Sequence, residues 1–171
     1  AFRCFGSLWP RGGFTGDNLA VFGRNLSFLD DAAFMAAVAR HAGDATERSI
    51  IWRTAVLVWA ARNGLRREGD FVECGCYRGT SARIVADTLG LGALDRRFWL
   101  YDLFECPEGA SFDRMPEHGP GLYAATRERF ADLPNVRVIQ GAVPGVLAGN
   151  APERIAFLHI DMNNAEAEIG A

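Results

Sequence analysis

From residue 69 onward, short apolar runs alternate with longer segments whose apolar residues have a helical period. The runs cover residues 71–74, 97–101, 136–140 and 155–160. The helical segments cover residues 81–89, 122–131 and about 143–147, and a last one begins near Asn164. Short apolar strands separated by helices are typical of a parallel sheet that is covered on both faces. The pattern therefore predicts an α/β fold with a doubly wound, mostly parallel, Rossmann-like sheet.

The residues before 69 predict a helical preface to this sheet. Asp30 or Asp31 caps a first helix that runs through residue 40. A second helix starts at Asp44 or Thr46 and ends at Gly64, a glycine in the usual position after a helix.

Residues 1–30 show no clear period, and we interpret them as an arm with aromatic anchors at Phe2, Phe5, Trp9 and Phe14. An arm of this kind packs on its own domain or on a neighbour, which favours a homodimer. We therefore divide the chain into residues 1–68, an N-terminal lid or dimer region, and residues 69–171, an incomplete Rossmann-like domain.

The last predicted helix is cut about two turns after its start. In a doubly wound sheet of strand order 3-2-1-4, the fourth strand (155–160) would then be an open apolar edge, which is an aggregation hazard. We therefore expect the sheet to be truncated after its fourth strand, and the 171 residues to be either a fragment or the ordered part of a longer chain.

Composition and charge narrow the possible partners. The net charge of −3 argues against nucleic acid, because phosphate binding usually needs a basic face. No apolar run reaches the roughly 18 residues of a membrane span, and no signal-peptide pattern is visible. The four cysteines lack the spacing of a zinc site and predict reduced thiols in a cytoplasmic protein. The segment has no lysine, which excludes a Schiff base within it.

The segment 70–81 predicts a cofactor site. It reads as a buried strand that ends in Glu73, a turn with Gly75 and Gly79, and a helix start at Ser81. Glycines allow a sharp turn and a close approach to a ligand, and the helix start presents free N–H groups there. The spacing departs from the Gly-x-Gly-x-x-Gly of dinucleotide enzymes, because position 77 is tyrosine. An acid here suits a positive sulfonium better than a phosphate.

Three more strand ends carry polar residues, at Asp102, at Gln140–Gly141 and at Asp161. In an open α/β sheet, ligands bind at the carboxyl ends of the central strands, so these residues should meet at one crevice. A carboxylate at Asp102 can accept both hydroxyls of a ribose. An acid that suits a sulfonium, a glycine turn and a carboxylate for the ribose together match S-adenosylmethionine (SAM).

Structural roles remain open for several of these residues. Glu73 could pair with Arg78 or cap a helix, and Asp102 could cap a turn. Gln140 and Gly141 could be plain turn residues. Tyr77 is either a packing residue or a lid contact, and Arg78 can close the loop by pairing with a carboxylate.

Four segments together resemble the macrocin O-methyltransferase family of class I SAM-dependent methyltransferases: residues 71–81, 100–105, 136–142 and 155–161. The family includes enzymes that methylate sugar hydroxyls on antibiotics. The resemblance covers roughly residues 45–171. It implies a SAM site and a divalent metal, usually Mg²⁺. By position, Glu73, Gly75 and Ser81 would line the methionine side, Asp102 would hold the ribose, and Gln140, Gly141 and Ala142 would lie near the adenine. We also expect the other turn residues Tyr77, Arg78 and Gly79 to bind the cofactor.

On the acceptor side, the resemblance implies that Asp161 is a metal-binding carboxylate and a catalytic residue. The family often has Asp-x-Asp here, whereas this chain has Asp161-Met-Asn163. Asparagine cannot take a proton at neutral pH. Either the base lies elsewhere, or the metal alone acidifies the hydroxyl, or the substrate differs. His159 alternates with Asp161 along the strand and is either a packed histidine or a catalytic residue.

The resulting prediction is a metal-assisted SAM-dependent O-methyltransferase that acts on a hydroxyl of a sugar or another small natural product. We expect the isolated 171-residue segment to be inactive, since Asp161 alone is a poor metal site. One alternative is a non-catalytic SAM-binding domain. Another is an NAD-dependent Rossmann oxidoreductase, against which the absent third glycine and Glu73 argue. The loop 106–121 is the expected lid or substrate wall.

Overall fold

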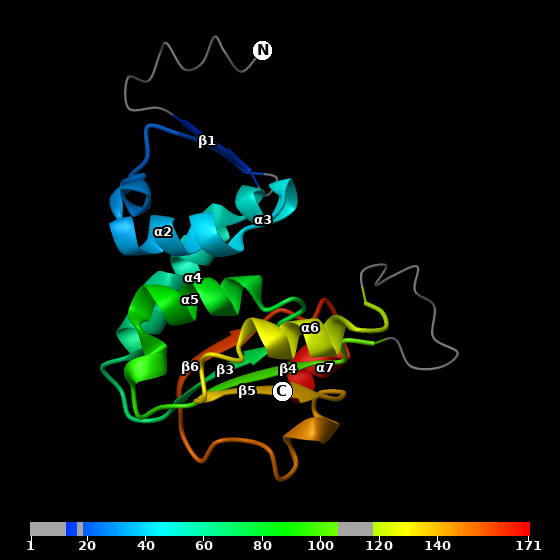
Figure 1. The fold of residues 1–171 in the computed structure, drawn as a ribbon. Coiled ribbons are helices and arrows are strands. Elements are labelled where there is room, and N and C mark those ends of the chain that lie inside the picture. The colour runs from blue at the N-terminus through cyan, green and yellow to red at the C-terminus, as the bar shows by residue number, and fades with distance from the viewer. Residues whose placement is uncertain (1–12, 17–18, 106–117) are drawn as a thin grey trace.

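The computed structural model describes residues 13–16, 19–105 and 118–171 (Figure 1). The arm residues Phe2, Phe5 and Trp9 and most of the predicted lid loop lie outside this part of the chain. Within it, one larger sheet forms the base of the molecule and the N-terminal elements stack above its helices (Figure 1). The strands of this sheet are β3 (Asp70–Cys74), β4 (Phe98–Asp102), β5 (Val136–Gln140) and β6 (Ile155–Ile160).

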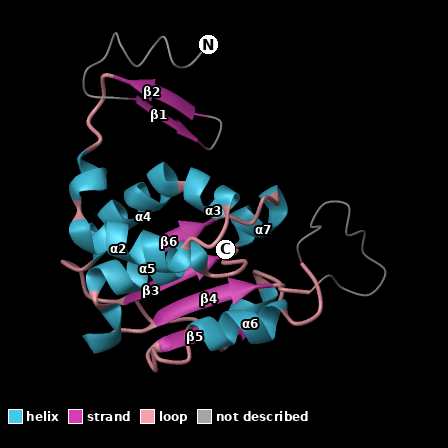
Figure 2. Ribbon diagram, turned by 45° about the horizontal axis from the view of Figure 1, so that its top comes forward, coloured by secondary structure: helices cyan, strands magenta, loops and turns pink. Residues whose placement is uncertain are grey.

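The four strands are parallel and lie in the order β5-β4-β3-β6 (Figure 2). This confirms the predicted parallel α/β sheet and its strand order. β3 and β4 lie in the centre, and their carboxyl ends therefore adjoin. β6 pairs with β3 on one side and is an edge strand of the described sheet.

Different elements cover the two faces of the sheet. Successive side chains of a strand point to opposite faces, so each strand contributes to both. Phe71 and Leu100 belong to the main core, together with residues of three helices that cover this face: α4 (Ile51–Gly64), α5 (Thr80–Leu89) and α6 (Leu122–Arg129). Val72 and Tyr101 face the other way and pack against Val146 and Met162. The short elements η2 (Leu91–Ala93), η4 (Gly145–Leu147) and α7 (Ala165–Gly170) complete this part of the chain.

The predicted first helix is present as α2 (Ala32–His41), and the side chain of Asp31 caps it by accepting the N–H of Phe34. It follows the short helix η1 (Ser27–Asp30). α2 packs on α5, and residues of both belong to the main core with the sheet. Residues on both sides of position 68 therefore contribute to one core, and the division into a lid or dimer region and a Rossmann-like domain stays a prediction.

The predicted second helix is two helices, α3 (Ala45–Ser49) and α4. Ile50 between them has ψ 15°, so its backbone leaves the helical range. The Ser49 hydroxyl donates to the carbonyl of Thr46, a local bond of the kind that competes with helix continuation. The pattern of apolar residues alone does not predict such a break in a helix.

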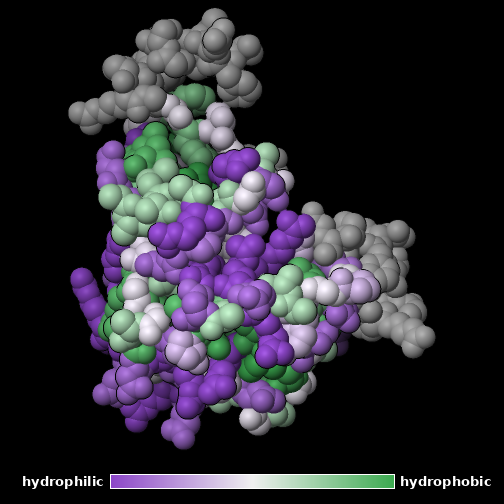
Figure 3. Space-filling model, viewed as in Figure 1, coloured by the Kyte–Doolittle hydropathy of each residue, from purple (hydrophilic) through white to green (hydrophobic). Residues whose placement is uncertain are grey.

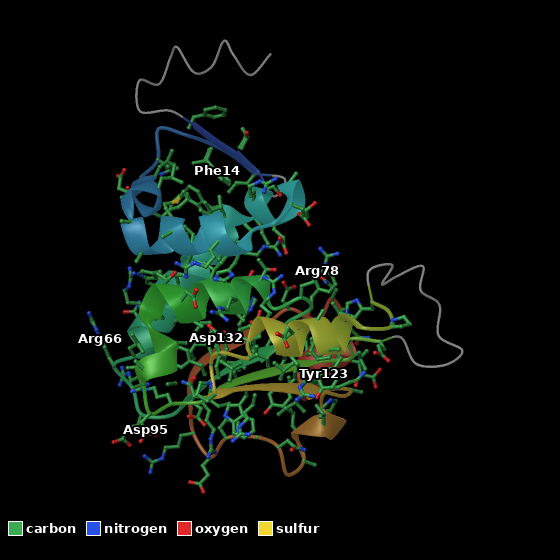
Figure 4. The ribbon with its side chains drawn as sticks, in the orientation of Figure 1. Phe14, Arg66, Arg78, Asp95, Tyr123 and Asp132 are labelled. Carbon is green, nitrogen blue, oxygen red and sulfur yellow. The ribbon has the colours of Figure 1, made fainter. Side chains whose placement is uncertain are left out.

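A hairpin of β1 (Gly13–Gly16) and β2 (Leu19–Phe22) lies within the segment that had no clear period. Its four-residue strands are too short to establish a period. Phe14 lies on this hairpin (Figure 4). It is buried, and its ring packs against Phe28 and Trp52. Hydrophobic residues gather below the hairpin on the face drawn in Figure 3. An open apolar hollow on α4 is lined by Phe28, Trp52, Ala55, Val56 and Trp59.

No helix in the described part of the chain is long and apolar enough to cross a membrane.

Candidate functional site

The carboxyl ends of the four strands bring the predicted site residues to one edge of the sheet. Glu73 of β3 lies opposite His159 of β6, and Asp102 of β4 lies opposite Gln140 of β5. The turn after β3 starts at Gly75, whose N–H donates to the carbonyl of Tyr101 in β4 at 2.8 Å. The predicted convergence of the strand ends is therefore present in the fold.

Both glycines of the turn have backbones in the left-handed region, with φ of 90° at Gly75 and 71° at Gly79. A Cβ on Gly75 would lie 2.1 Å from the carbonyl oxygen of Asp161, and one on Gly79 would lie 2.6 Å from the ring of Phe130. Glycine is required at both positions by conformation and by neighbouring protein atoms. Gly75 thereby lets the end of β6 approach the turn.

Tyr77 occupies the centre of the turn with φ 48°, a strained value for a bulky residue. Its N–H donates to Oδ2 of Asp102 at 2.7 Å. The guanidinium of Arg78 lies over the tyrosine ring, 5.1 Å from its centroid. Arg78, which is labelled in Figure 4, also has Nη1 3.3 Å from Oδ2 of Asp44. The carboxylate with which Arg78 pairs beside the turn is therefore that of Asp44 and not that of Glu73.

Asp102 is only 7% exposed, and protein groups contact both of its carboxylate oxygens. Oδ1 accepts the N–H of Phe104 at 2.9 Å and lies 3.0 Å from Nε2 of His118. The ring of His118 also lies beside that of Tyr77, with 5.4 Å between the centroids. A carboxylate oxygen accepts about two hydrogen bonds, so Oδ1 is filled and Oδ2 has room for one more donor.

Glu73 and His159 form a buried pair on the face of the sheet that α4 covers. Oε1 of Glu73 lies 2.9 Å from Nδ1 of His159, and Glu73 is only 4% exposed. Burial lowers the pKa of His159, whereas the bond and charge of Glu73 raise it, and the net effect is a raised pKa. Glu73 therefore pairs with neither a helix end nor Arg78 in the described structure.

Asp161 follows β6 directly, and its N–H donates to the carbonyl of Cys74 at 2.9 Å. Its Oδ2 lies 3.5 Å from Nη1 of Arg53, which projects from α4. Both side chains are more than a third exposed. Sequence reasoning did not find Arg53, because an arginine on a mostly apolar helix is read as part of its solvated face.

The side chains around Asp161 decide whether the predicted divalent metal can be held there. No three His, Cys, Asp or Glu side chains within the described ranges are placed to hold a metal ion together. Asp161 contributes one carboxylate, and the arginine beside it would repel a second cation. Asn163 has φ 52°, and the side chain of Asn164 caps α7. The described residues do not fit a divalent cation.

The remaining cofactor candidates lie beside Asp102 or at the start of α5. Gln140 donates from Nε2 to the carbonyl of Leu103 at 3.3 Å, and the N–H of Gly141 donates to the carbonyl of Asp102 at 2.9 Å. Ala142 accepts the N–H of Val146 through its carbonyl. Ser81 is half-buried in the first turn of α5.

Two cysteines lie next to the turn and are buried as free thiols, Cys74 and Cys76. Burial, helped by the charge of Glu73, raises the pKa of Cys74 to about 11 and the pKa of Cys76 well above its usual value. Since the thiolate is the nucleophile, neither thiol is suited to covalent chemistry at neutral pH.

Comparison with known proteins supports the fold. The chain resembles the solved structure of the O-methyltransferase NovP, with a TM-score of 0.51 and 23% sequence identity. The match covers 68% of this chain and 56% of the NovP chain, so the residues compared span little more than half of that protein. It identifies the parallel sheet as a Rossmann-like sheet of the kind found in an O-methyltransferase. No protein-family model and no curated protein matches the chain.

Proposed function

We propose that the protein is a SAM-dependent methyltransferase that methylates a hydroxyl group of a small molecule, such as a sugar or another natural product. The observation that carries the proposal is the junction of the β3 turn with Asp102. A glycine turn and a buried carboxylate meet at the adjoining ends of the two central strands. The sheet that carries both belongs to a fold that resembles the O-methyltransferase NovP.

The donor side follows from this junction. Oδ2 of Asp102 has room for a ribose hydroxyl beside the Tyr77 amide. Glu73, at the end of β3, supplies negative charge toward the sulfonium. Gln140, Gly141 and Ala142 continue the edge beyond Asp102 and suit the adenine. Arg78, Gly79 and Ser81 complete the turn and the helix start at the methionine end.

The chemistry is an in-line displacement at the sulfonium methyl. The acceptor oxygen bonds to the methyl carbon while the carbon–sulfur bond breaks, and its electron pair stays on sulfur to give S-adenosylhomocysteine. The hydroxyl proton must be removed. We assign this to Nε2 of His159, because Glu73 holds Nδ1 and orients the ring. Asn163 cannot perform this role.

The acceptor side also contains Asp161 and Arg53. We infer that this pair contacts the acceptor, since Asp161 lies two residues beyond His159 at the end of the same strand. Magnesium assistance would draw on Asp161, but the described residues offer it no completed ligand set, and no step here depends on it.

A second candidate function, SAM binding without catalysis, is favoured by two features of the acceptor side. Asn163 in place of an acid, and an arginine beside Asp161, suit a domain that binds SAM without turnover. An NAD-dependent oxidoreductase gains no support from the geometry, because the tyrosine in the turn and the adjacent Glu73 oppose a pyrophosphate.

The test is calorimetry of the full chain with SAM, S-adenosylhomocysteine and NAD, followed by transfer of tritiated methyl from SAM to a panel of hydroxylated acceptors. We expect S-adenosylhomocysteine to bind and NAD not to bind. Binding of NAD without S-adenosylhomocysteine would overturn the proposal. Cofactor binding without transfer to any sugar or phenol would favour the non-catalytic function.

A further inference from the structure

The cofactor turn is held from outside by a segment of the N-terminal region. Residues 43–48, which we call the bracket, comprise Gly43, the N-cap residue Asp44 and the first four residues of α3. Oγ1 of Thr80 donates to Oε1 of Glu47 at 2.5 Å, although 33 residues separate the two in the chain. Thr80 is the first residue of α5 and is only 8% exposed. The bond therefore joins the bracket to the helix start that closes the turn.

The bracket is itself rigidly built. Oε2 of Glu47 accepts the N–H groups of Gly43 at 2.6 Å and Asp44 at 3.4 Å. The N–H of Glu47 in return donates to Oδ1 of Asp44 at 2.9 Å. This reciprocal arrangement is a capping box. One carboxylate thus uses one oxygen for its own helix and the other for Thr80, so the position of Thr80 depends on the fold of the bracket.

The turn needs such external support. Tyr77 and Gly79 both have positive φ, and strained backbone persists only where its surroundings over-determine it. Gly79 has no side chain with which to cap α5. From inside, Asp102 holds the amide of Tyr77 at 2.7 Å. From outside, Thr80 is the buried attachment, and the exposed pair of Arg78 with Asp44 adds a second, weaker one.

We propose that Glu47 is a positioning residue for the methyl donor, acting through Thr80 on the turn that binds the cofactor. This inference rests on the proposed function, because it concerns the same cofactor turn. Its content is that an acid of the N-terminal helices, outside the sheet, determines how tightly the donor is held. The bond is part-buried, and hydrogen bonds to a carboxylate are among the stronger kind.

The cleanest test replaces Thr80 and leaves the capping box intact. T80V keeps the β-branched shape and removes only the hydroxyl, whereas T80S keeps the hydroxyl. T88V is the matched control, because the Thr88 hydroxyl lies on the same helix and donates only locally, to the carbonyl of Ile84. The readouts are the dissociation constant for S-adenosylhomocysteine by calorimetry on the full chain, and the melting temperature of each variant.

We expect T80V to bind S-adenosylhomocysteine about tenfold more weakly, and T80S and T88V to bind it like the parent. E47A should weaken binding to a similar extent, and E47A/T80V should be no worse than E47A. In turnover assays the KM for SAM should rise while kcat changes little. Unchanged affinity in T80V, or a loss that T80S shares, would overturn the inference.

The two proposals fail in different ways. If the parent chain does not bind S-adenosylhomocysteine, the proposed function fails. If the parent binds it and T80V binds it equally well, the function stands and only the role of Glu47 is lost. A fall in melting temperature without a change in affinity would likewise overturn the positioning role, because it would show that the bond serves stability alone.

Discussion

Glu73 and His159 face each other across the β3–β6 pair, with Oε1 and Nδ1 2.9 Å apart, although 86 residues separate them in the chain. The pair is largely removed from solvent. An acid so placed fixes the orientation of the imidazole and favours its protonated form. The pair therefore has consequences for both stability and titration.

The first prediction concerns the pH dependence of stability. The folded pKa of His159 is raised above its ordinary value of 6.5, so its stabilising contribution is complete below pH 6.5 and is lost as the pH rises through the folded pKa. In E73Q the pKa of His159 should fall, and this part of the pH dependence should disappear. NMR titration of the imidazole and denaturant unfolding between pH 5.5 and 8 measure both. An unchanged pKa in E73Q would contradict the pairing.

The second prediction concerns the glycine turn. G75A places a Cβ against the Asp161 carbonyl in a left-handed backbone. It should lower the free energy of unfolding by about 3 kcal/mol or more and weaken S-adenosylhomocysteine binding. G90A is the control, since Gly90 also has positive φ but nothing lies within 4 Å of its added Cβ. G90A should cost only about 1 kcal/mol. Equal losses would show that the contact with β6 is unimportant.

The third prediction concerns His118, whose Nε2 lies 3.0 Å from Oδ1 of Asp102, the oxygen beside the one proposed to accept a ribose hydroxyl. H118A should open one acceptor position on this oxygen for the second ribose hydroxyl and strengthen S-adenosylhomocysteine binding by about fivefold, as measured by calorimetry. H41A is the control, because His41 contacts Asp87 and lies away from the strand ends. Weaker binding in H118A would instead show that His118 contacts the cofactor directly.

The fourth prediction concerns the poor fit of the acceptor side to a divalent metal. If the charge of Arg53 is one reason, R53M should increase the affinity for Mn²⁺ by about tenfold, because the cation beside Asp161 is removed. Electron paramagnetic resonance of Mn²⁺ titrations measures this. R62M removes an arginine of the same helix that pairs with Asp31 and should leave the affinity unchanged. A similar affinity in R53M and the parent would exclude charge repulsion as the cause.

The strands could be predicted from sequence because their apolar runs are short and bounded by turn residues. The runs 136–140 and 155–160 have the bounds of β5 and β6. The hairpin β1–β2 could not, because four residues are too few to show a period. The break at Ile50 is accompanied by a side-chain hydrogen bond of Ser49, and an apolar pattern encodes neither.

In the candidate site, too, some features could be predicted from the sequence and others could not. The positions of Glu73, Asp102 and Asp161 at strand ends follow from the order of the elements and the geometry of parallel sheets. Their partners do not. Arg53 contacts Asp161 although 108 positions separate them in the chain. Glu47 and Thr80 belong to different helices. Such pairs arise from packing between distant segments and leave no local signal in one sequence.

The pairing of β6 with β3 also bears on the order in which the crevice is assembled. Only α5 and the short η2 lie between β3 and β4, so their pairing, and with it the contact of Tyr77 with Asp102, closes a short loop. Pairing β6 closes a loop more than three times longer, and the loop-closure entropy is correspondingly larger. During refolding, the donor half should therefore gain protection from hydrogen exchange before His159 and Asp161 reach their places.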